Sequence, residues 1–159
     1  MKINRLIYIF GTFLFVLACS TEKNTFVTRT YHNITAKYNA YFNGKESFKA
    51  GLQKVDDSFE DDYTHILPIF KYGDENIAQS VAPEMERAID KATKVIEKHS
   101  ITAKPKNLKK KKSERKKLTD KEKEYYSKTE YNKWVDDSYL MMGKAYFYEH
   151  EFMMAIKTF

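Results

Sequence analysis

Apolar residues recur at helical intervals along much of this chain, and residues that make tight turns are rare. The 159 residues include only 5 Gly and 3 Pro, too few for the many turns of a β-sandwich or barrel. In the stretch 83–99 the apolar side chains follow the i, i+3, i+4, i+7 spacing of an amphipathic helix. These are Met85, Ala88, Ile89, Ala92, Val95 and Ile96. The sequence therefore predicts an all-α fold.

The first 18 residues have the form of a secretory signal peptide. Lys2 and Arg5 flank the start of an apolar run of 13 residues, 6–18. As a helix this run would span about 20 Å, short of the ~30 Å hydrocarbon core of a bilayer, so a signal fits better than a membrane span. The run ends in Val-Leu-Ala followed by Cys19, the only cysteine.

Such an ending resembles a bacterial lipobox, in which the signal is cleaved before the cysteine and the thiol carries a diacylglycerol lipid. Several acyl chains anchor a protein stably where one chain is marginal. We therefore expect lipid attachment at Cys19, a polar tether over 19–28, and no other cofactor. A plain signal with a chance cysteine and an uncleaved amphipathic anchor are the alternatives.

Residues 29–103 are expected to form an N-terminal helical region with hairpins like those of tetratricopeptide repeats. Aromatic and small residues at helical intervals predict a hairpin of helices 34–42 and 45–55. Asn43 and Gly44 are expected to form its turn, because glycine readily adopts the left-handed backbone conformation that ends many helices. The apolar run 63–72 is expected to lie as an extended strap, or a short strand, over neighbouring helices. Pro83 is expected in the first turn of a helix 83–99.

A basic tract divides this region from the end of the chain. Residues 104–117 hold nine Lys or Arg and one Glu, and we expect 104–128 to be a flexible, solvated insertion. The tract lacks the interleaved aromatics of a base-stacking surface, and an export signal makes nucleic acid an improbable partner. Attraction to anionic lipid or glycan phosphates is the alternative.

Residues 129–159 match the tetratricopeptide pattern of spaced aromatic, apolar, Gly, Tyr, Ala and Phe positions. The matching residues are Tyr139, Met142, Gly143, Tyr146, Ala155 and Phe159. The spacing predicts helices over 132–149 and from 151 onward, joined by a turn at 149–151 that lacks the favoured glycine. A complete repeat ends after its second helix, but this sequence stops at Phe159, inside that helix, so we expect a fragment of a longer protein. A generic amphipathic helix pair is the alternative.

Three segments, 29–46, 62–73 and 132–139, together with the lipobox, resemble the tetratricopeptide lipoproteins of the SprE and PorW type. Those proteins belong to the type IX secretion and gliding-motility machinery of Bacteroidota. The resemblance implies a scaffold anchored in the outer membrane, facing the periplasm, whose partners are other proteins of that apparatus. The basic tract is longer than is typical of such proteins.

No catalytic or metal-ligating arrangement is visible in the sequence. The four histidines (His32, His65, His99 and His150) lack paired ligand spacing, and no GxSxG, GxGxxG or P-loop occurs. We therefore expect neither an enzyme, a metal site nor a small-molecule substrate. Two other functions stay open: a nutrient-binding lipoprotein of the SusD type, and an accessory of outer-membrane protein assembly.

Overall fold

The computed structural model describes residues 21, 23–106 and 118–159, and this part of the chain is helical and contains no strand. The all-α prediction is confirmed. The predicted signal peptide 1–18, Cys19 and residues 107–117 of the basic tract lie outside the described residues. The helices are α2 (Phe26–Thr35), the π-helix η1 (Ala36–Tyr41), α3 (Phe42–Ser58), α4 (Glu75–His99), α6 (Asp120–Ser127), α7 (Val135–Tyr148) and α8 (Phe152–Thr158). Across the described helices, none combines the length and apolar character that a bilayer span needs.

The chain divides into two compact units. Of the described residues, unit 1 comprises 21, 23–32, 100–106 and 118–132, and unit 2 comprises 33–99 and 133–159. Helix α2 begins at Phe26, three residues before the expected start of the helical region, and runs from unit 1 into unit 2.

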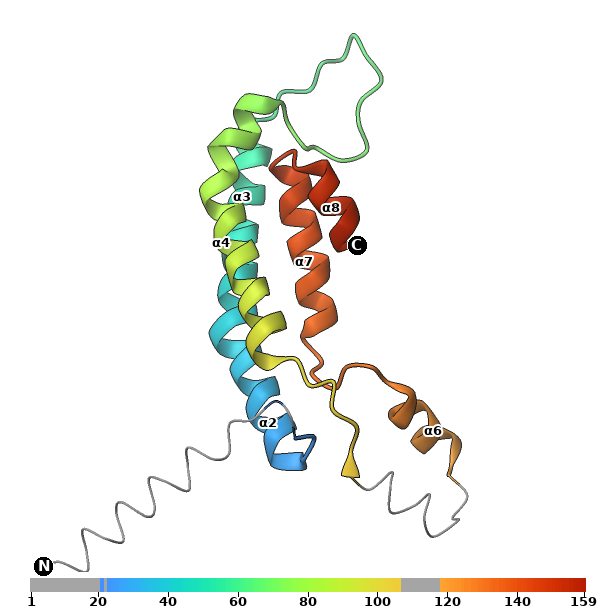
Figure 1. The fold of residues 1–159 in the computed structure, drawn as a ribbon. Coiled ribbons are helices and arrows are strands. Elements are labelled where there is room, and N and C mark those ends of the chain that lie inside the picture. The colour runs from blue at the N-terminus through green and yellow to red at the C-terminus, as the bar shows by residue number, and fades with distance from the viewer. Residues whose placement is uncertain (1–20, 22, 107–117) are drawn as a thin grey trace, which may run out of the picture. The chain divides into compact units, whose positions relative to one another are not determined.

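Unit 2 is an array of antiparallel helices in sequence order. Figure 1 shows α3 and α4 side by side and running in opposite directions, with α7 and α8 following in the same alternation. The most extensive contacts join α3 to α4, α4 to α7, and α7 to α8, whereas α3 barely touches α7. Each helix therefore packs chiefly on its neighbour in this sequence, the arrangement found in helical solenoids.

The predicted hairpin turn at Asn43 and Gly44 is wrong, because both residues lie inside α3. A Cβ atom on Gly44 would lie 2.8 Å from Met141 Cε and 2.9 Å from Lys91 Cβ. Gly51, two turns later, faces Met85 in the same way, and Ser47 between them donates a hydrogen bond to the Glu84 carbonyl (2.9 Å). The glycines serve close helix packing, and no turn is needed.

Helices α2, η1 and α3 follow one another without a break from Phe26 to Ser58. The π-helix η1 keeps one face of this continuous helix against α4. Ala36, Ala40 and Gly44 are buried at successive steps of four residues. In an α-helix each such step rotates the buried face by about 40° beyond a full turn. The wider turn of a π-helix reduces that rotation, so Ala36 and Ala40 stay packed near Val95.

Helix α4 begins eight residues earlier than predicted, and Pro83 lies in its interior. Asp74 caps it: its carboxylate accepts a hydrogen bond from the Ile77 amide (2.9 Å) and its carbonyl accepts one from the Ala78 amide (2.9 Å). Proline lacks an N–H and leaves one helical hydrogen bond unmade. The buried face nevertheless continues through Pro83 with alternating three- and four-residue spacing, the pattern of a coiled-coil seam. Its residues are Ala78, Val81, Met85, Ala88, Ala92 and Val95.

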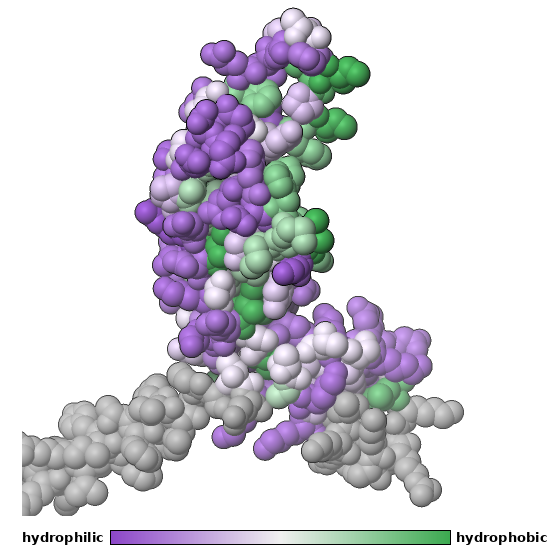
Figure 2. Space-filling view, turned by 45° about the horizontal axis from the view of Figure 1, so that its top comes forward, coloured by the Kyte–Doolittle hydropathy of each residue, from purple (hydrophilic) through white to green (hydrophobic). Residues whose placement is uncertain are grey.

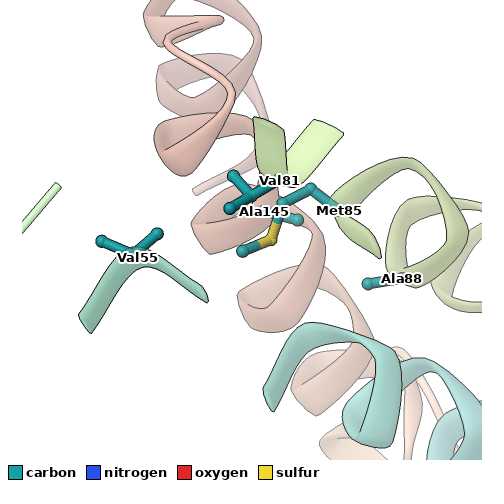
Figure 3. Close-up of a cluster of buried hydrophobic side chains, with 5 residues drawn as sticks. All are labelled: Val55, Val81, Met85, Ala88 and Ala145. Atoms are coloured by element: carbon teal, nitrogen blue, oxygen red, sulfur yellow. The ribbon is translucent and has the colours of Figure 1, made fainter. Parts of the chain in front are cut away.

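Met85 lies at the centre of the main hydrophobic core. It is fully buried, with Val55 from α3 and Ala145 from α7 in the same cluster. Figure 3 shows Met85 close to Val81 and Ala145, with Val55 and Ala88 on either side of this group. Small residues dominate the seam, which allows the helices to pack closely.

The segment 63–72 does not form the expected strap or a strand. Ile66 is 99% exposed and Ile69 is 93% exposed, so neither lies over a helix. At the end of the segment, the Tyr72 ring lies 5.8 Å from the Phe147 ring of α7. The apolar composition indicated burial, but these side chains face outward.

In unit 1 a single carboxylate joins two segments far apart in the sequence. Glu130 accepts hydrogen bonds from the Ile101 amide (2.7 Å), the Tyr131 amide (2.8 Å), the Asn132 amide (2.6 Å) and the Ser100 hydroxyl. The Tyr131 amide also donates to the Ile101 carbonyl (3.0 Å). Together these bonds hold residues 100–101 beside residues 130–132.

Part of the segment predicted to be flexible is helical. Helix α6 starts with a capping box, in which the Thr119 hydroxyl accepts from the Glu122 amide and the Glu122 carboxylate accepts from the Thr119 amide (2.9 Å). The Thr-x-x-Glu spacing of this box is readable in the sequence. The density of charge around it obscured the signal.

Candidate protein-docking site

The turn between α7 and α8 is a Schellman motif with histidine at the position that glycine usually takes. The Glu151 amide donates to the Tyr146 carbonyl (2.9 Å), and the His150 amide donates to the Phe147 carbonyl (3.1 Å). His150 has φ of 62°, in the left-handed region. Side-chain contacts offset this unfavourable conformation. The ring stacks on Phe152 at 5.3 Å, and Nδ1 lies 3.4 Å from a carboxylate oxygen of Glu75.

Of the six residues that match the repeat pattern, four lie on α7, Ala155 lies on α8 and Phe159 ends α8. Gly143 and Phe159 lie close together. A Cβ atom on Gly143 would lie 2.8 Å from the Phe159 ring, so this glycine lets the end of α8 approach α7. Ala155 is buried, and Met142 and Tyr146 are half-buried. The Thr93 hydroxyl lies 3.7 Å from the Met142 sulfur, in hydrogen-bonding geometry. Phe159 is 69% exposed and Tyr139 is 41% exposed.

Tyr139 and Phe159 line a groove on the outer side of α7 and α8. Its volume is about 410 Å³, and its other lining residues are Asp136, Leu140 and Thr158. Leu140 is 47% exposed, and Ile156 on α8 is 70% exposed. We call the groove lined by Asp136, Tyr139, Leu140, Thr158 and Phe159 the docking groove. Exposed apolar surface of this kind, rimmed by a carboxylate, is typical of a surface that binds another protein segment.

The sequence pattern identified only part of the docking groove. Leu140, Thr158 and Asp136 follow no position of the repeat pattern. The sequence does offer a signal for Leu140, because it is an apolar residue beside Tyr139 on a predicted helix.

Glu149, next to the turn, has an unusual environment. Burial, with further contributions from the charges of Glu86 and Glu151, raises its pKa from 4.5 to about 7. Within the described part of the chain, its Oε1 is buried and has no hydrogen-bond partner. The neutral carboxylic acid is therefore the favoured form in the folded protein below neutral pH.

This raised pKa predicts how stability depends on pH. Between the unfolded pKa of 4.5 and the folded pKa of about 7, the folded state binds the extra proton, so stability falls as pH rises through this window. Glu149→Gln is expected to raise the free energy of unfolding at about pH 8 by about 1 kcal/mol, with allowance for solvent screening. Urea unfolding across this pH range measures the effect.

The matched control is Glu97→Gln, which changes an exposed carboxylate on α4. We expect it to leave the pH dependence as in the unsubstituted protein. Equal pH slopes for Glu149→Gln and the unsubstituted protein would contradict the prediction.

Among residues 21, 23–106 and 118–159, no group of three or more His, Cys, Asp or Glu side chains is placed to hold a metal ion. No protein-family model matches the chain, and no curated protein matches its sequence.

Proposed function

We propose that this chain is a lipid-anchored tetratricopeptide scaffold that holds other proteins of the cell envelope. The observation that carries this proposal is the antiparallel array of α3, α4, α7 and α8. In such an array each helix covers the face of the one before, and the last helix leaves an apolar face exposed for binding. Figure 2 shows green apolar side chains along one side of the array.

The docking groove supports binding of a helical segment with an apolar side chain and a basic neighbour. The apolar side chain would fill the space between Tyr139 and Phe159, and the basic neighbour would face Asp136. Binding of this kind needs no catalytic group, so we propose an adaptor and not an enzyme. The partners are protein components, with no nucleic acid, metal or small-molecule substrate.

Features of the sequence support a location for this scaffold in the cell envelope. A diacylglycerol lipid on Cys19 would anchor it to the outer membrane on the periplasmic side, as the lipobox and the resemblance to SprE- and PorW-type lipoproteins imply. Type IX secretion and gliding motility are the proposed processes.

Complementation tests the role of the groove. In a strain lacking the gene, the unsubstituted protein should restore export of cargo proteins, and Leu140→Glu should fail, because a carboxylate in the groove opposes apolar binding and adds to the charge of Asp136. Lys144→Glu is the matched control, since Lys144 is exposed on the same helix. Both variants should fold, as measured by circular dichroism. Full export with Leu140→Glu would contradict the proposal.

A further inference from the structure

The loop between α3 and α4 carries several apolar side chains that are exposed. Ile66 and Ile69 are almost fully exposed, and Phe70 is 70% exposed. Figure 2 shows dark green side chains among purple ones at the top of the view, where Figure 1 places this loop. We call Ile66, Leu67, Pro68, Ile69 and Phe70 the apolar tip. Leaving such side chains in water forgoes the free energy of burial, so the apolar tip marks a contact surface.

Hydrogen bonds shape a local turn at the first end of this loop, and ring contacts hold its second end. On the first side, Asp62 accepts hydrogen bonds from the Thr64 amide (2.9 Å) and the Thr64 hydroxyl (2.6 Å). On the second side, the Tyr72 ring lies 5.8 Å from the His150 ring. Lys71 Nζ lies 5.6 Å from the centre of the Phe59 ring and links the two sides.

Gly73 completes the anchoring of the loop. It has φ of 76°, and a Cβ atom there would lie 2.6 Å from the Ile77 side chain. Only glycine fits this position without displacement of Ile77. The apolar tip therefore lies between a hydrogen-bonded turn and an anchored end, which lowers the entropy cost of binding.

The charge around the apolar tip favours a protein partner over an anionic membrane surface. From Asp56 to Glu75 the sequence holds seven carboxylates and one lysine. Hydrogen bonds from Thr64 and His65 lower the pKa of Asp62, so this carboxylate stays charged. An anionic membrane surface would repel such a loop, whereas a protein surface with an apolar pocket and a rim of Lys or Arg would complement it.

We propose that the apolar tip of the α3–α4 loop inserts into an apolar pocket with a basic rim on a partner protein. The acidic residues before the tip align and accelerate this encounter through attraction to the rim. This surface belongs to another part of unit 2 than the docking groove, and the proposal does not rest on the function proposed for that groove.

Site-specific photocrosslinking in the cells that make the full chain tests this proposal. A benzophenone side chain replaces Phe70, a position where an aromatic group already projects outward, and mass spectrometry identifies the crosslinked peptide. The expected product joins the apolar tip to one partner protein, at a peptide with apolar residues and an excess of Lys or Arg. The same group at Ala50, which is exposed on α3, is the control and should not give this product.

Two sets of substitutions separate the apolar and the charged parts. Ile66→Asn with Ile69→Asn should reduce the crosslink about tenfold or more, and Glu60→Lys with Asp61→Lys should reduce it about fivefold. Circular dichroism should be unchanged, because all four residues are exposed. Crosslinks to lipid, to a second copy of this chain or to an acidic peptide would overturn the proposal, as would the absence of any crosslink at Phe70.

Discussion

Replacing Gly44 with valine is expected to lower the free energy of unfolding by about 2–3 kcal/mol. The first added carbon would meet Lys91 Cβ at 2.9 Å and Met141 Cε at 2.8 Å. The end of the Met141 side chain can rotate away, but Lys91 Cβ is fixed to the backbone of α4. The two further methyl groups of valine would force α3 and α4 apart. Urea unfolding followed by circular dichroism measures the loss.

Ala50→Val is the matched control for this substitution. Ala50 is exposed on α3, so valine there changes only helix propensity, by about 0.5 kcal/mol. Gly44→Val and Ala50→Val with equal stability would show that Gly44 makes no close contact with α4.

Replacing Glu130 with alanine is expected to lower the free energy of unfolding by about 2–3 kcal/mol, because half-buried backbone donors would lose a charged acceptor. The amides of Ile101 and Asn132 lose their carboxylate partner, and the Ser100 hydroxyl loses the same group. Urea unfolding measures the total effect. Hydrogen exchange should show faster exchange at the amides of Ile101 and Asn132 before it changes elsewhere in unit 1.

Glu124→Ala provides the comparison, because Glu124 is an exposed acidic residue on α6. It should leave exchange at Ile101 and Asn132 unchanged. If Glu130→Ala protects these amides as well as the unsubstituted protein does, the carboxylate does not hold the two segments together.

The sequence predicted best where burial follows a regular period. Alternating three- and four-residue spacing along α4 indicated an amphipathic helix, and its end at His99 was predicted correctly. Its start was missed because Pro83 is favoured in a first helical turn, whereas Asp74 supplies the actual cap. A local preference for proline could not reveal that the apolar face began earlier.

Residues with two structural uses caused the other errors. Asn-Gly is typical of turns, but glycine also permits close helix packing. At Gly44 the closeness of Lys91 on α4 shows that the glycine serves packing, and the sequence does not reveal this contact. The apolar tip was predicted to be buried because sequence pattern alone does not show which apolar segments face outward. The contacts of Glu130 had no signal in the sequence, since they join residues about 30 positions apart.

The docking groove was partly predictable for a related reason. The repeat pattern identified Gly143 and Phe159, which the structure brings together, because that spacing reflects contacts between adjacent helices. Residues that line an outer surface have no such fixed spacing. Thr158 therefore required the three-dimensional arrangement, and for Leu140 the sequence offered only its apolar character beside Tyr139.

Quantitative proteomics of a strain lacking the gene tests the proposed scaffold most directly. Secreted, outer-membrane and periplasmic fractions are compared with those of the parent strain, and surface gliding is recorded in parallel. The proposed function predicts that type IX cargo disappears from the secreted fraction and gliding stops, while outer-membrane barrel proteins keep their abundance. Normal cargo export would contradict it, and a general loss of barrel proteins would favour a role in outer-membrane assembly instead.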